Sequence, residues 1–117
     1  MSNKPDCLFC KMIRGDIETD KVMETDRIFA FRDINPQAPT HILIIPKKHI
    51  PTVNDIKEED GDLVGEMVLA AKKIAGDEGV ASDGYRLVFN CNKKAGQAVF
   101  HIHLHLLGGR SFSWPPG

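Results

Sequence analysis

Three of the five histidines of the chain stand in one short segment, FHIHLHLL at residues 100–107, where each alternates with a large apolar residue. An imidazole acts as nucleophile, acid, base or metal ligand near neutral pH. On a β-strand, this alternation places His101, His103 and His105 on one face, whereas on a helix residues two apart diverge. The pattern therefore predicts a strand over residues 98–107 with a chemically capable face.

A single histidine on a strand is usually an ordinary solvated or hydrogen-bonded residue. Three in register, preceded by a loop with Gly96, form instead a surface that combines nucleophilic and proton-transfer roles. For one ring nitrogen to attack as a nucleophile, the other must hold its proton in a fixed hydrogen bond, and a backbone carbonyl is the usual partner.

Two of the three cysteines, Cys7 and Cys10, are spaced as a pair of thiolate ligands, and Cys91 stands alone. An odd number of cysteines, in a chain whose first six residues lack the apolar stretch of a secretory signal, argues against a disulfide framework. We expect a cytoplasmic protein in which Cys7 and Cys10 are either metal ligands or reduced thiols in a small helix, with Cys91 inert.

The length of 117 residues and the mass of 13.0 kDa fit one domain, residues 1–117, with no room for a second core. With 42% apolar and 26% charged residues, the composition excludes disordered and collagenous chains. Fifteen basic against sixteen acidic residues give a formal net charge of -1, so we expect no nucleic-acid partner. No apolar run approaches the roughly 20 residues that cross a bilayer, so we expect no membrane partner.

The elements that must position the histidines are predicted from residue periodicity, capping residues and prolines. They form an antiparallel α+β domain: a five-stranded sheet with one long helix, which covers one sheet face, and one short helix. In chain order we predict a helix over 6–14 capped by Asp6 and stopped at Gly15, strands over 21–25 and 27–32, a proline-containing loop over 33–40, a buried central strand over 41–45, a helix over 57–78, strands over 85–90 and 98–107, and an irregular tail over 108–117.

The alternation of three histidines with apolar residues resembles the defining motif of the histidine triad family. Other segments resemble the branch called histidine triad nucleotide-binding proteins, from about residue 7 to the end of the chain. These segments are AFRDI at 30–34, PQAPTH at 36–41, IPKKH at 45–49, GYR at 84–86, GQ at 96–97, GGR at 108–110 and WPPG at 114–117.

Members of that branch are homodimeric hydrolases of purine nucleoside phosphoramidates, such as adenosine 5′-phosphoramidate, and of aminoacyl or lysyl adenylates. The resemblance implies the same activity here, on nucleotides of the AMP or GMP type. It also implies a sheet that extends across a homodimer, with the tail over 108–117 near the active site and the dimer interface. Hydrolysis of dinucleoside polyphosphates is the competing reaction within the family, and the GGR and WPPG segments argue against it.

The family assigns nucleophilic attack to the middle histidine, which implies that His103 forms a transient nucleotidyl-histidine that water then hydrolyses. The resemblance places His105 at the phosphate oxygens. It has His101 orient the cluster and His41 buttress it. No metal is required for this chemistry.

A nucleotide site is implied as well. Asp33 is expected at the ribose hydroxyls, from which a carboxylate accepts hydrogen bonds. Asn90 and Gln97 match phosphate-side positions through their side chains, and Val99 matches one through its backbone N–H. Five apolar residues are expected around the base, namely Leu8, Phe9, Ile17, Phe31 and Ile34. Phe9, Ile17 and Phe31 are each equally explained as ordinary core.

Two further positions concern the amine that leaves. Ala98 stands where some relatives carry serine, so a hydrogen bond from that hydroxyl is missing and the preferred leaving group stays open. Trp114 resembles a residue that reaches across the dimer toward the partner's site, and it is equally explained as an interface anchor.

Zinc-containing relatives complete a tetrahedral site with two cysteines and two histidines. The resemblance therefore implies a structural zinc on Cys7, Cys10, His49 and His101. His49 also occurs in relatives without the cysteines, so reduced thiols remain the alternative. A bound metal would restrict His101 to holding its strand in place.

The sequence leaves hypotheses of three classes. The first is a dimeric nucleoside phosphoramidase that uses His103. The second is a nucleotide-binding regulatory or scaffold protein whose hydrolysis is incidental. The third is a zinc-binding module, which would leave the Asp33 loop without a purpose.

Overall fold

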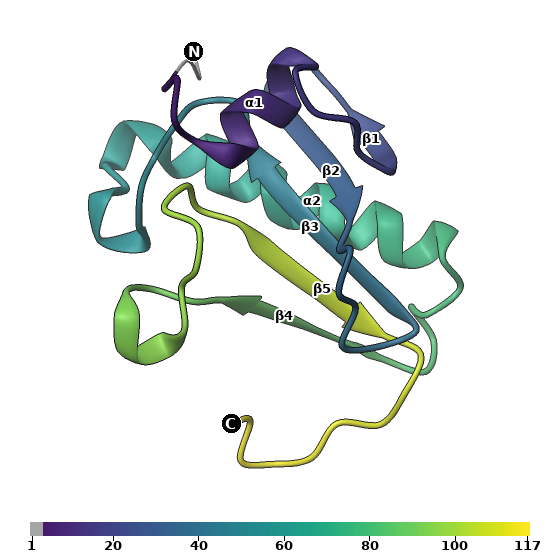
Figure 1. Cartoon of the computed structure of the whole chain (residues 1–117). Coiled ribbons are helices and arrows are strands. Elements are labelled where there is room, and N and C mark those ends of the chain that lie inside the picture. The colour runs from purple at the N-terminus through teal and green to yellow at the C-terminus, as the bar shows by residue number, and fades with distance from the viewer. Residues whose placement is uncertain (1–3) are drawn as a thin grey trace.

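The centre of the structure, a computed structural model that describes residues 4–117, is a five-stranded antiparallel sheet in the order β1-β2-β3-β5-β4 (Figure 1). The predicted fold class is therefore confirmed, and β3 is the central strand, as predicted. The strands are β1 Lys21–Glu24, β2 Ile28–Arg32, β3 Thr40–Pro46, β4 Tyr85–Phe89 and β5 Leu104–Gly108.

One face of the sheet is covered by the long helix α2, Gly61–Asp77, which lies behind the strands in Figure 1. Alternate residues of the strands point toward this helix and are buried between the two layers. This larger core includes Ile28, Ile42, Ile44, Leu104 and Leu106 from the sheet and Leu63, Met67 and Ile74 from the helix.

The long helix begins later than the predicted range of 57–78. Residues Glu58–Asp60 form a separate 3-10 turn, in which the buried Asp60 carboxylate accepts hydrogen bonds from the backbone N–H of Lys57 (3.0 Å) and from Lys48 Nζ. The apolar periodicity starts only at Leu63, so residues 57–62 offer no apolar helical face that would continue α2 toward its N-terminus.

The opposite face of the sheet is covered only in part, by the short helix α1, Leu8–Arg14. Its Phe9 side chain packs with alternate residues of β2 and β3, namely Phe29, Phe31, Leu43 and Ile45. The predicted helix position and its stop at Gly15 (φ +86°) are confirmed. The predicted cap is wrong by one residue, because Cys7 Sγ, not Asp6, accepts the hydrogen bond from the Cys10 N–H (3.4 Å).

The predicted strand over 98–107 is also corrected, because β5 begins only at Leu104. The register that pairs Ile44 with Leu104 would bring Ile102 opposite Pro46, which has no N–H to donate to a ladder. The Ile102 N–H instead donates to the carbonyl of Ile50 (2.7 Å). His101 and His103 therefore lie in a non-strand segment that leads into the sheet.

The loop predicted over 33–40 is irregular up to residue 39, since β3 begins at Thr40, and the tail beyond β5 is irregular, as predicted. Two short 3-10 turns lie in other connections, Val53–Asp55 before α2 and Lys93–Ala95 between β4 and β5. The loop joins β2 to β3, and the tail runs from the end of β5 along the side of β4 in Figure 1. Within residues 4–117, no helix has the length and apolar character needed to cross a membrane.

Candidate active site

The histidines gather on the sheet face that α2 does not cover. His105 lies on β5 opposite Leu43 of β3, whose side chain belongs to the α1 side of the sheet. Its ring centroid is 4.9 Å from that of His103 and 5.3 Å from that of His41. Although the strand begins late, the predicted alternation is confirmed, because Ile102, Leu104 and Leu106 enter the core on the other face.

The hydrogen bond of His103 fixes its tautomer. Its Nδ1 lies 2.9 Å from the carbonyl oxygen of His101, which can only accept, so Nδ1 carries the proton. This is the backbone partner that the sequence argument requires for a nucleophile. His103 is 8% exposed, and burial lowers its pKa, which favours a neutral ring with a lone pair on Nε2.

A second set of hydrogen bonds selects the other tautomer, with the proton on Nε2, for His41 and His105. The backbone N–H of Gln37 donates to His41 Nδ1 (3.0 Å), so the proton of the neutral His41 ring lies on Nε2. His41 Nε2 lies 3.0 Å from His105 Nδ1, which must then accept. His105 is left with its proton on Nε2. Two neighbouring rings thus differ: His103 offers a lone pair and His105 offers an N–H.

Electrostatics keep this group neutral. Burial, followed by the neighbouring rings of His103 and His41, lowers the pKa of His105 to about 4, against which the Asp33 carboxylate acts weakly. Burial also lowers the pKa of His41, again with Asp33 opposing. The tautomers that the hydrogen bonds select are therefore the relevant ones at neutral pH.

Asp33 lies where β2 ends, beside these histidines. Its backbone N–H donates to the carbonyl of His41 (3.0 Å), and its Oδ1 accepts from the N–H of Asn35 (2.8 Å). Its Oδ2 is 3.5 Å from His41 Nε2. The structure thus brings Asp33 to the histidine face, as the ribose assignment requires, and its carboxylate is oriented by its own loop.

The residues expected around the base are in different environments. Phe9 and Phe31 are buried in the core between α1 and the sheet, and the edge of Phe9 meets His103, with ring centroids 5.1 Å apart. Leu8 is 41% exposed, Ile17 is half-buried, and Ile34 on the loop after β2 is 98% exposed. Phe9 therefore links the small core directly to the histidines.

Of the residues expected at the phosphate, Gln97 has its side chain already engaged. Its Oε1 accepts from the N–H of Asn92 (2.8 Å), and its Nε2 donates to the carbonyls of Pro51 (2.7 Å) and Val99 (3.1 Å). Gln97 is buried and ties the loop before His101 into shape.

The other residues expected at the phosphate and at the leaving amine lie in different surroundings. Val99 packs against the small core, and Asn90 follows β4 and is half-buried. Ala98 is exposed in a cleft of about 500 Å³ that Leu8 and Phe100 also line. Trp114 on the tail is 83% exposed.

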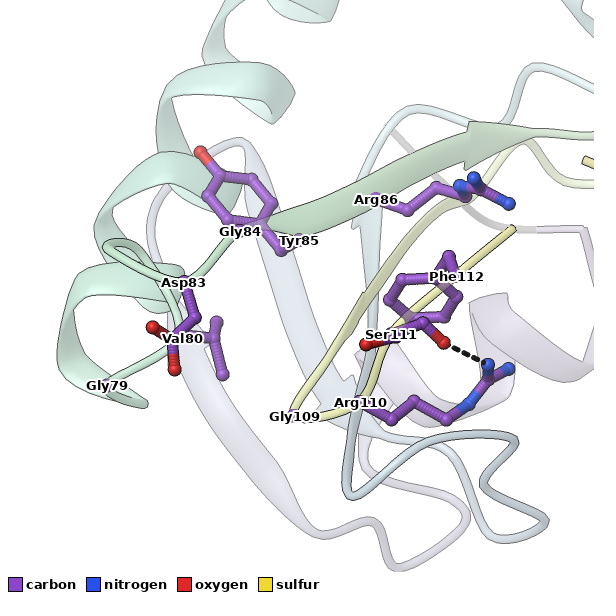
Figure 2. A pocket seen from close by; sticks show the side chains of 10 residues that line it. All are labelled: Gly79, Val80, Asp83, Gly84, Tyr85, Arg86, Gly109, Arg110, Ser111 and Phe112. Carbon is purple, nitrogen blue, oxygen red and sulfur yellow. Dashed lines mark hydrogen bonds between the residues drawn. The ribbon is translucent and has the colours of Figure 1, made fainter. Parts of the chain in front are cut away.

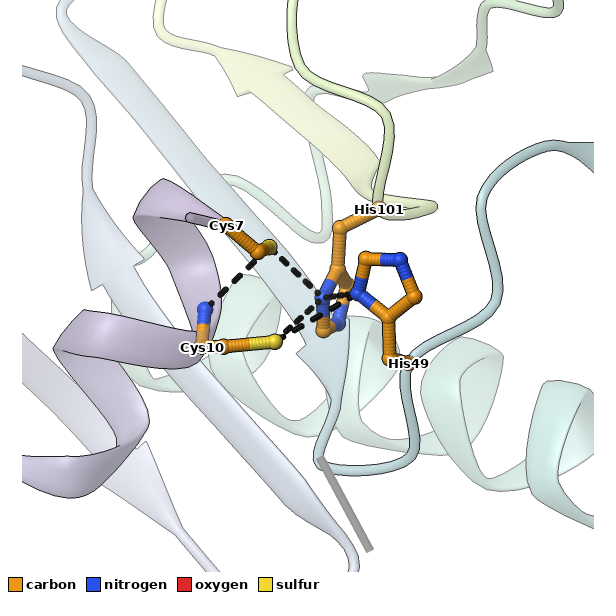
Figure 3. A group of neighbouring side chains, drawn as sticks. All are labelled: Cys7, Cys10, His49 and His101. Carbon is orange, nitrogen blue, oxygen red and sulfur yellow. Dashed lines mark hydrogen bonds between the residues drawn. The ribbon is translucent and has the colours of Figure 1, made fainter. Parts of the chain in front are cut away.

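The two cysteines converge with two histidines, as Figure 3 shows. Cys7 Sγ and His101 Nδ1 are 3.4 Å apart, Cys10 Sγ and His49 Nδ1 are 3.4 Å apart, and the two Nδ1 atoms are 3.2 Å apart. Ligands around a tetrahedral zinc ion are separated by about 3.3 to 3.8 Å, so the four atoms fit such an ion. His101 Nε2 donates to the carbonyl of Pro46 (2.7 Å), which turns the Nδ1 lone pair toward the cluster.

A second group with the composition of a metal site, Asp33, His41 and His105, does not suit a cation. The Gln37 N–H occupies the Nδ1 lone pair of His41, so the proton of this neutral ring stands on Nε2, the nitrogen that faces the group. The hydrogen bonds of the histidines therefore turn a lone pair toward the cysteine cluster, which suits a cation, and a proton toward the Asp33 group, which does not.

The sequence predicts a carbonyl partner for the nucleophilic histidine and an irregular loop over 33–40, but it does not predict the N–H of Gln37, which sets the tautomers of His41 and His105. The one usable signal for this N–H is the pair of prolines that hold Gln37 in a rigid loop four residues before His41.

Comparison with known proteins places this fold and site in one family. The HIT domain model matches residues 14–112, and the chain belongs to the HIT, or histidine triad, family. The resemblance identified from the sequence is thereby confirmed.

Individual relatives agree with this assignment. The chain is 57% identical over 103 residues to the purine nucleoside phosphoramidase of Escherichia coli K12, covering 88% of this chain and 87% of that protein. A HIT-like protein of Synechocystis is 51% identical over 112 residues, covering 96% and 97%.

Solved structures agree as well. The HIT family hydrolase of Legionella pneumophila has a TM-score of 0.94 with 58% identity, covering 96% of this chain and all (100%) of that one. A histidine triad protein from Clostridium difficile has a TM-score of 0.92 with 41% identity, covering 95% and 96%.

Proposed function

We propose that this HIT family hydrolase cleaves the P–N bond of purine nucleoside phosphoramidates, through a nucleotidyl-histidine intermediate on His103. The observation that carries the proposal is the opposite tautomers of His103 and His105, a lone pair beside an N–H, which suit attack on phosphorus and stabilisation of the phosphoryl group. The name of the E. coli relative supports the choice of substrate class.

In the first step, His103 Nε2 forms a bond to phosphorus and the P–N bond breaks. The departing nitrogen takes up one proton from solvent and leaves as an amine. The carbonyl of His101, which accepts from His103 Nδ1–H, stabilises the positive charge that forms on the attacking ring. The Nε2–H of His105 is the donor that faces the phosphoryl oxygens or the leaving nitrogen.

In the second step, water attacks the same phosphorus and releases the nucleoside monophosphate. The bond from phosphorus to His103 breaks, and His103 returns to its neutral form. The water supplies one oxygen to the product and returns one proton to solvent, which balances the proton that the amine took up. Two accessible steps thus replace one difficult displacement.

For the nucleotide, Asp33 is proposed at the ribose hydroxyls and the rim of Leu8, Ile34 and Phe9 at the base. Asn90 and the Val99 N–H are proposed at the phosphate. Since the Gln97 amide already bonds to the loop, its contribution is to hold Val99 in position.

We further propose a structural zinc on Cys7, Cys10, His49 and His101. Burial raises the pKa of the Cys7 thiol and lowers that of His101 to about 4, so both groups are neutral without a cation. A divalent cation supplies the charge against which buried thiols ionise. Its contribution would be structural, joining α1 to the segment before β5.

The test of the proposed function is release of ammonia from adenosine 5′-phosphoramidate by the purified protein and by a His103→Ala variant. We expect turnover by the wild type and a loss in kcat of at least about a thousandfold in the variant. Calorimetric titration with AMP is the control, since the variant should still bind the nucleotide. Binding without turnover by the wild type would instead favour a regulatory nucleotide-binding protein.

A further inference from the structure

The GGR segment of the tail makes a contact that the proposed chemistry does not yet use. Arg110 Nε donates to the backbone carbonyl of Gln37 at 2.9 Å, although 73 residues separate them. Gly109, with φ +88°, allows the close approach, because a Cβ at this position would lie 2.9 Å from Pro39 Cβ. The tail is therefore docked on the loop between β2 and β3.

The loop in turn sets the tautomer of the histidines. Gln37 is held at both of its peptide groups: its C=O accepts from Arg110 and its N–H donates to His41 Nδ1. A continuous series of contacts of 2.9, 3.0 and 3.0 Å thus runs from Arg110 through Gln37 and His41 to His105.

Gln37 itself is exposed, so water could replace either of its partners. If its N–H turned away, His41 Nδ1 could carry the proton and its Nε2 would face His105 as a lone pair. The direction of the whole series would then reverse, and His105 would lose the N–H that it offers to substrate. The direction of the hydrogen bonds between Gln37, His41 and His105 therefore depends on how firmly the loop between β2 and β3 is held.

Arg110 is exposed, and its guanidinium makes two further contacts. Its guanidinium carbon lies 4.3 Å from the centroid of the Phe112 ring, and its Nη1 donates to the carbonyl of Ser111 (3.0 Å), the contact drawn in Figure 2. Arg86 packs on the same ring at 5.1 Å and donates to the carbonyl of Ser113 (3.0 Å). These side chains border a cavity of about 670 Å³, so replacing Arg110 disturbs no core.

We propose that Arg110 is a positioning residue for catalysis: by fixing the Gln37 peptide from the tail, it selects the tautomers of His41 and His105 that present an N–H to substrate. Its effect on the tautomers stands on the geometry alone. Its effect on the rate rests on the proposed phosphoramidase function.

The first experiment measures tautomers directly, by two-bond ¹H–¹⁵N correlation of the imidazole rings in ¹⁵N-labelled protein at neutral pH. In the wild type we expect both His41 and His105 to be protonated at Nε2. In Arg110→Met, which removes the donor to the Gln37 carbonyl, we expect a second tautomer in both rings. In Arg110→Gln, whose Nε2–H stands at the same position along the side chain as the arginine Nε–H, we expect a pattern closer to the wild type. Identical patterns in wild type and Arg110→Met would overturn the proposal, whatever the activity.

Arg86→Met is the matched control. It removes the β4 guanidinium that packs on Phe112 and donates to the Ser113 carbonyl of the tail, but it leaves the contact of Arg110 with Gln37 in place. We expect no change in the tautomers of this variant. A change equal to that of Arg110→Met would show that general loosening of the tail is responsible, which also overturns the proposal.

The second experiment separates positioning from binding. With adenosine 5′-phosphoramidate, Arg110→Met is expected to lower kcat on the order of tenfold with KM nearly unchanged. With the p-nitrophenyl ester of AMP, whose leaving group departs without a proton, the loss should be smaller. An equal loss on both substrates, or a change in KM alone, would contradict positioning through His105. No turnover by the wild type would count against the proposed function and leave the tautomer result to stand.

Discussion

At the scale of single residues, the chemistry depends on which nitrogen of each ring carries a proton. His103 and His105 are the same amino acid two positions apart, yet a carbonyl fixes one and a relayed backbone N–H fixes the other. The difference comes from backbone partners, so substitutions that move the backbone should affect catalysis as strongly as substitutions of the rings.

The low pKa of His105 predicts the pH dependence of activity. Burial, then His103 and His41, lowers its pKa to about 4, so the ring is neutral where an ordinary histidine, with a pKa of about 6.5, would be half protonated. We expect kcat/KM for adenosine 5′-phosphoramidate to show no titration of this ring near pH 6.5 and to fall only in more acidic solution. Initial rates measured across this range check the prediction, and a titration of His105 near pH 6.5 would contradict it.

The lowered pKa of His105 also makes the stability of the fold depend on pH. Between its unfolded pKa of about 6.5 and its folded pKa of about 4, His105 binds more protons in the unfolded chain than in the folded one. Its contribution therefore makes the free energy of unfolding decrease as the pH falls through this window. Urea unfolding at both ends of the window measures the change.

Residue types and their alternation were enough to predict which histidines share a face, and the resemblance to the histidine triad family added that His103 is the nucleophile and therefore needs a carbonyl partner. They could not predict tautomers or the contact of Arg110 with Gln37, because a main-chain N–H or C=O is the same for every residue. Nor could the sequence show that the Gln97 side-chain amide hydrogen-bonds to the backbone of Asn92 and Pro51, because only the fold brings Pro51 near it.

At the scale of elements, α2 packs one row of its side chains into the larger core against the sheet. Met67 is fully buried against the sheet, whereas Leu69 two residues later is 63% exposed. We expect Met67→Ala to lower the free energy of unfolding by about 2 to 4 kcal/mol and Leu69→Ala by less than about 0.5 kcal/mol. Urea titrations of both variants test this, and similar losses would mean that the helix packs differently.

The short helix α1 depends on its contacts, because seven residues are too few for a stable isolated helix. The proposed zinc would bind Cys7 and Cys10 at the start of α1 and so join this turn to His49 and His101. We expect about one zinc per chain by elemental analysis of the purified protein, a lower melting temperature after chelation, and loss of the metal in Cys10→Ser. Cys91→Ser is the control, since Cys91 lies outside the cluster, and equal metal content in all three proteins would refute the site.

Most element positions follow from periodicity and caps, and the two main exceptions each have a cause in another segment of the chain. The strand predicted over 98–107 lost its first half because Pro46 ends the ladder on β3. The long helix lost its first turn because polar residues there bond to Lys48 and to each other. Each error arises from a partner distant in sequence, which a pattern within one segment does not contain.

At the scale of the whole molecule, β4 is an edge strand whose five residues are all half-buried. Such an edge offers unpaired backbone groups to another strand. We expect a homodimer formed through β4, with a mass near 26 kDa by light scattering, about twice the chain mass of 13.0 kDa.

Val88→Lys tests this arrangement, because a lysine on an edge strand disfavours pairing between sheets. The variant should shift toward the monomer and retain its secondary structure by circular dichroism. Val68→Lys, on the exposed side of α2, provides the comparison. A wild-type monomer, or a dimer that both variants leave intact, would contradict pairing through β4.

The unequal covering of the sheet also bears on how such a protein can change over generations. The α2 side holds the larger core, while the histidine side rests on a small cluster and on exposed rim positions such as Ile34 and Ala98. Mutations at that rim cost little stability, whereas mutations beneath α2 are purged. A lineage with this fold can therefore explore new leaving groups on one side while the other preserves the scaffold.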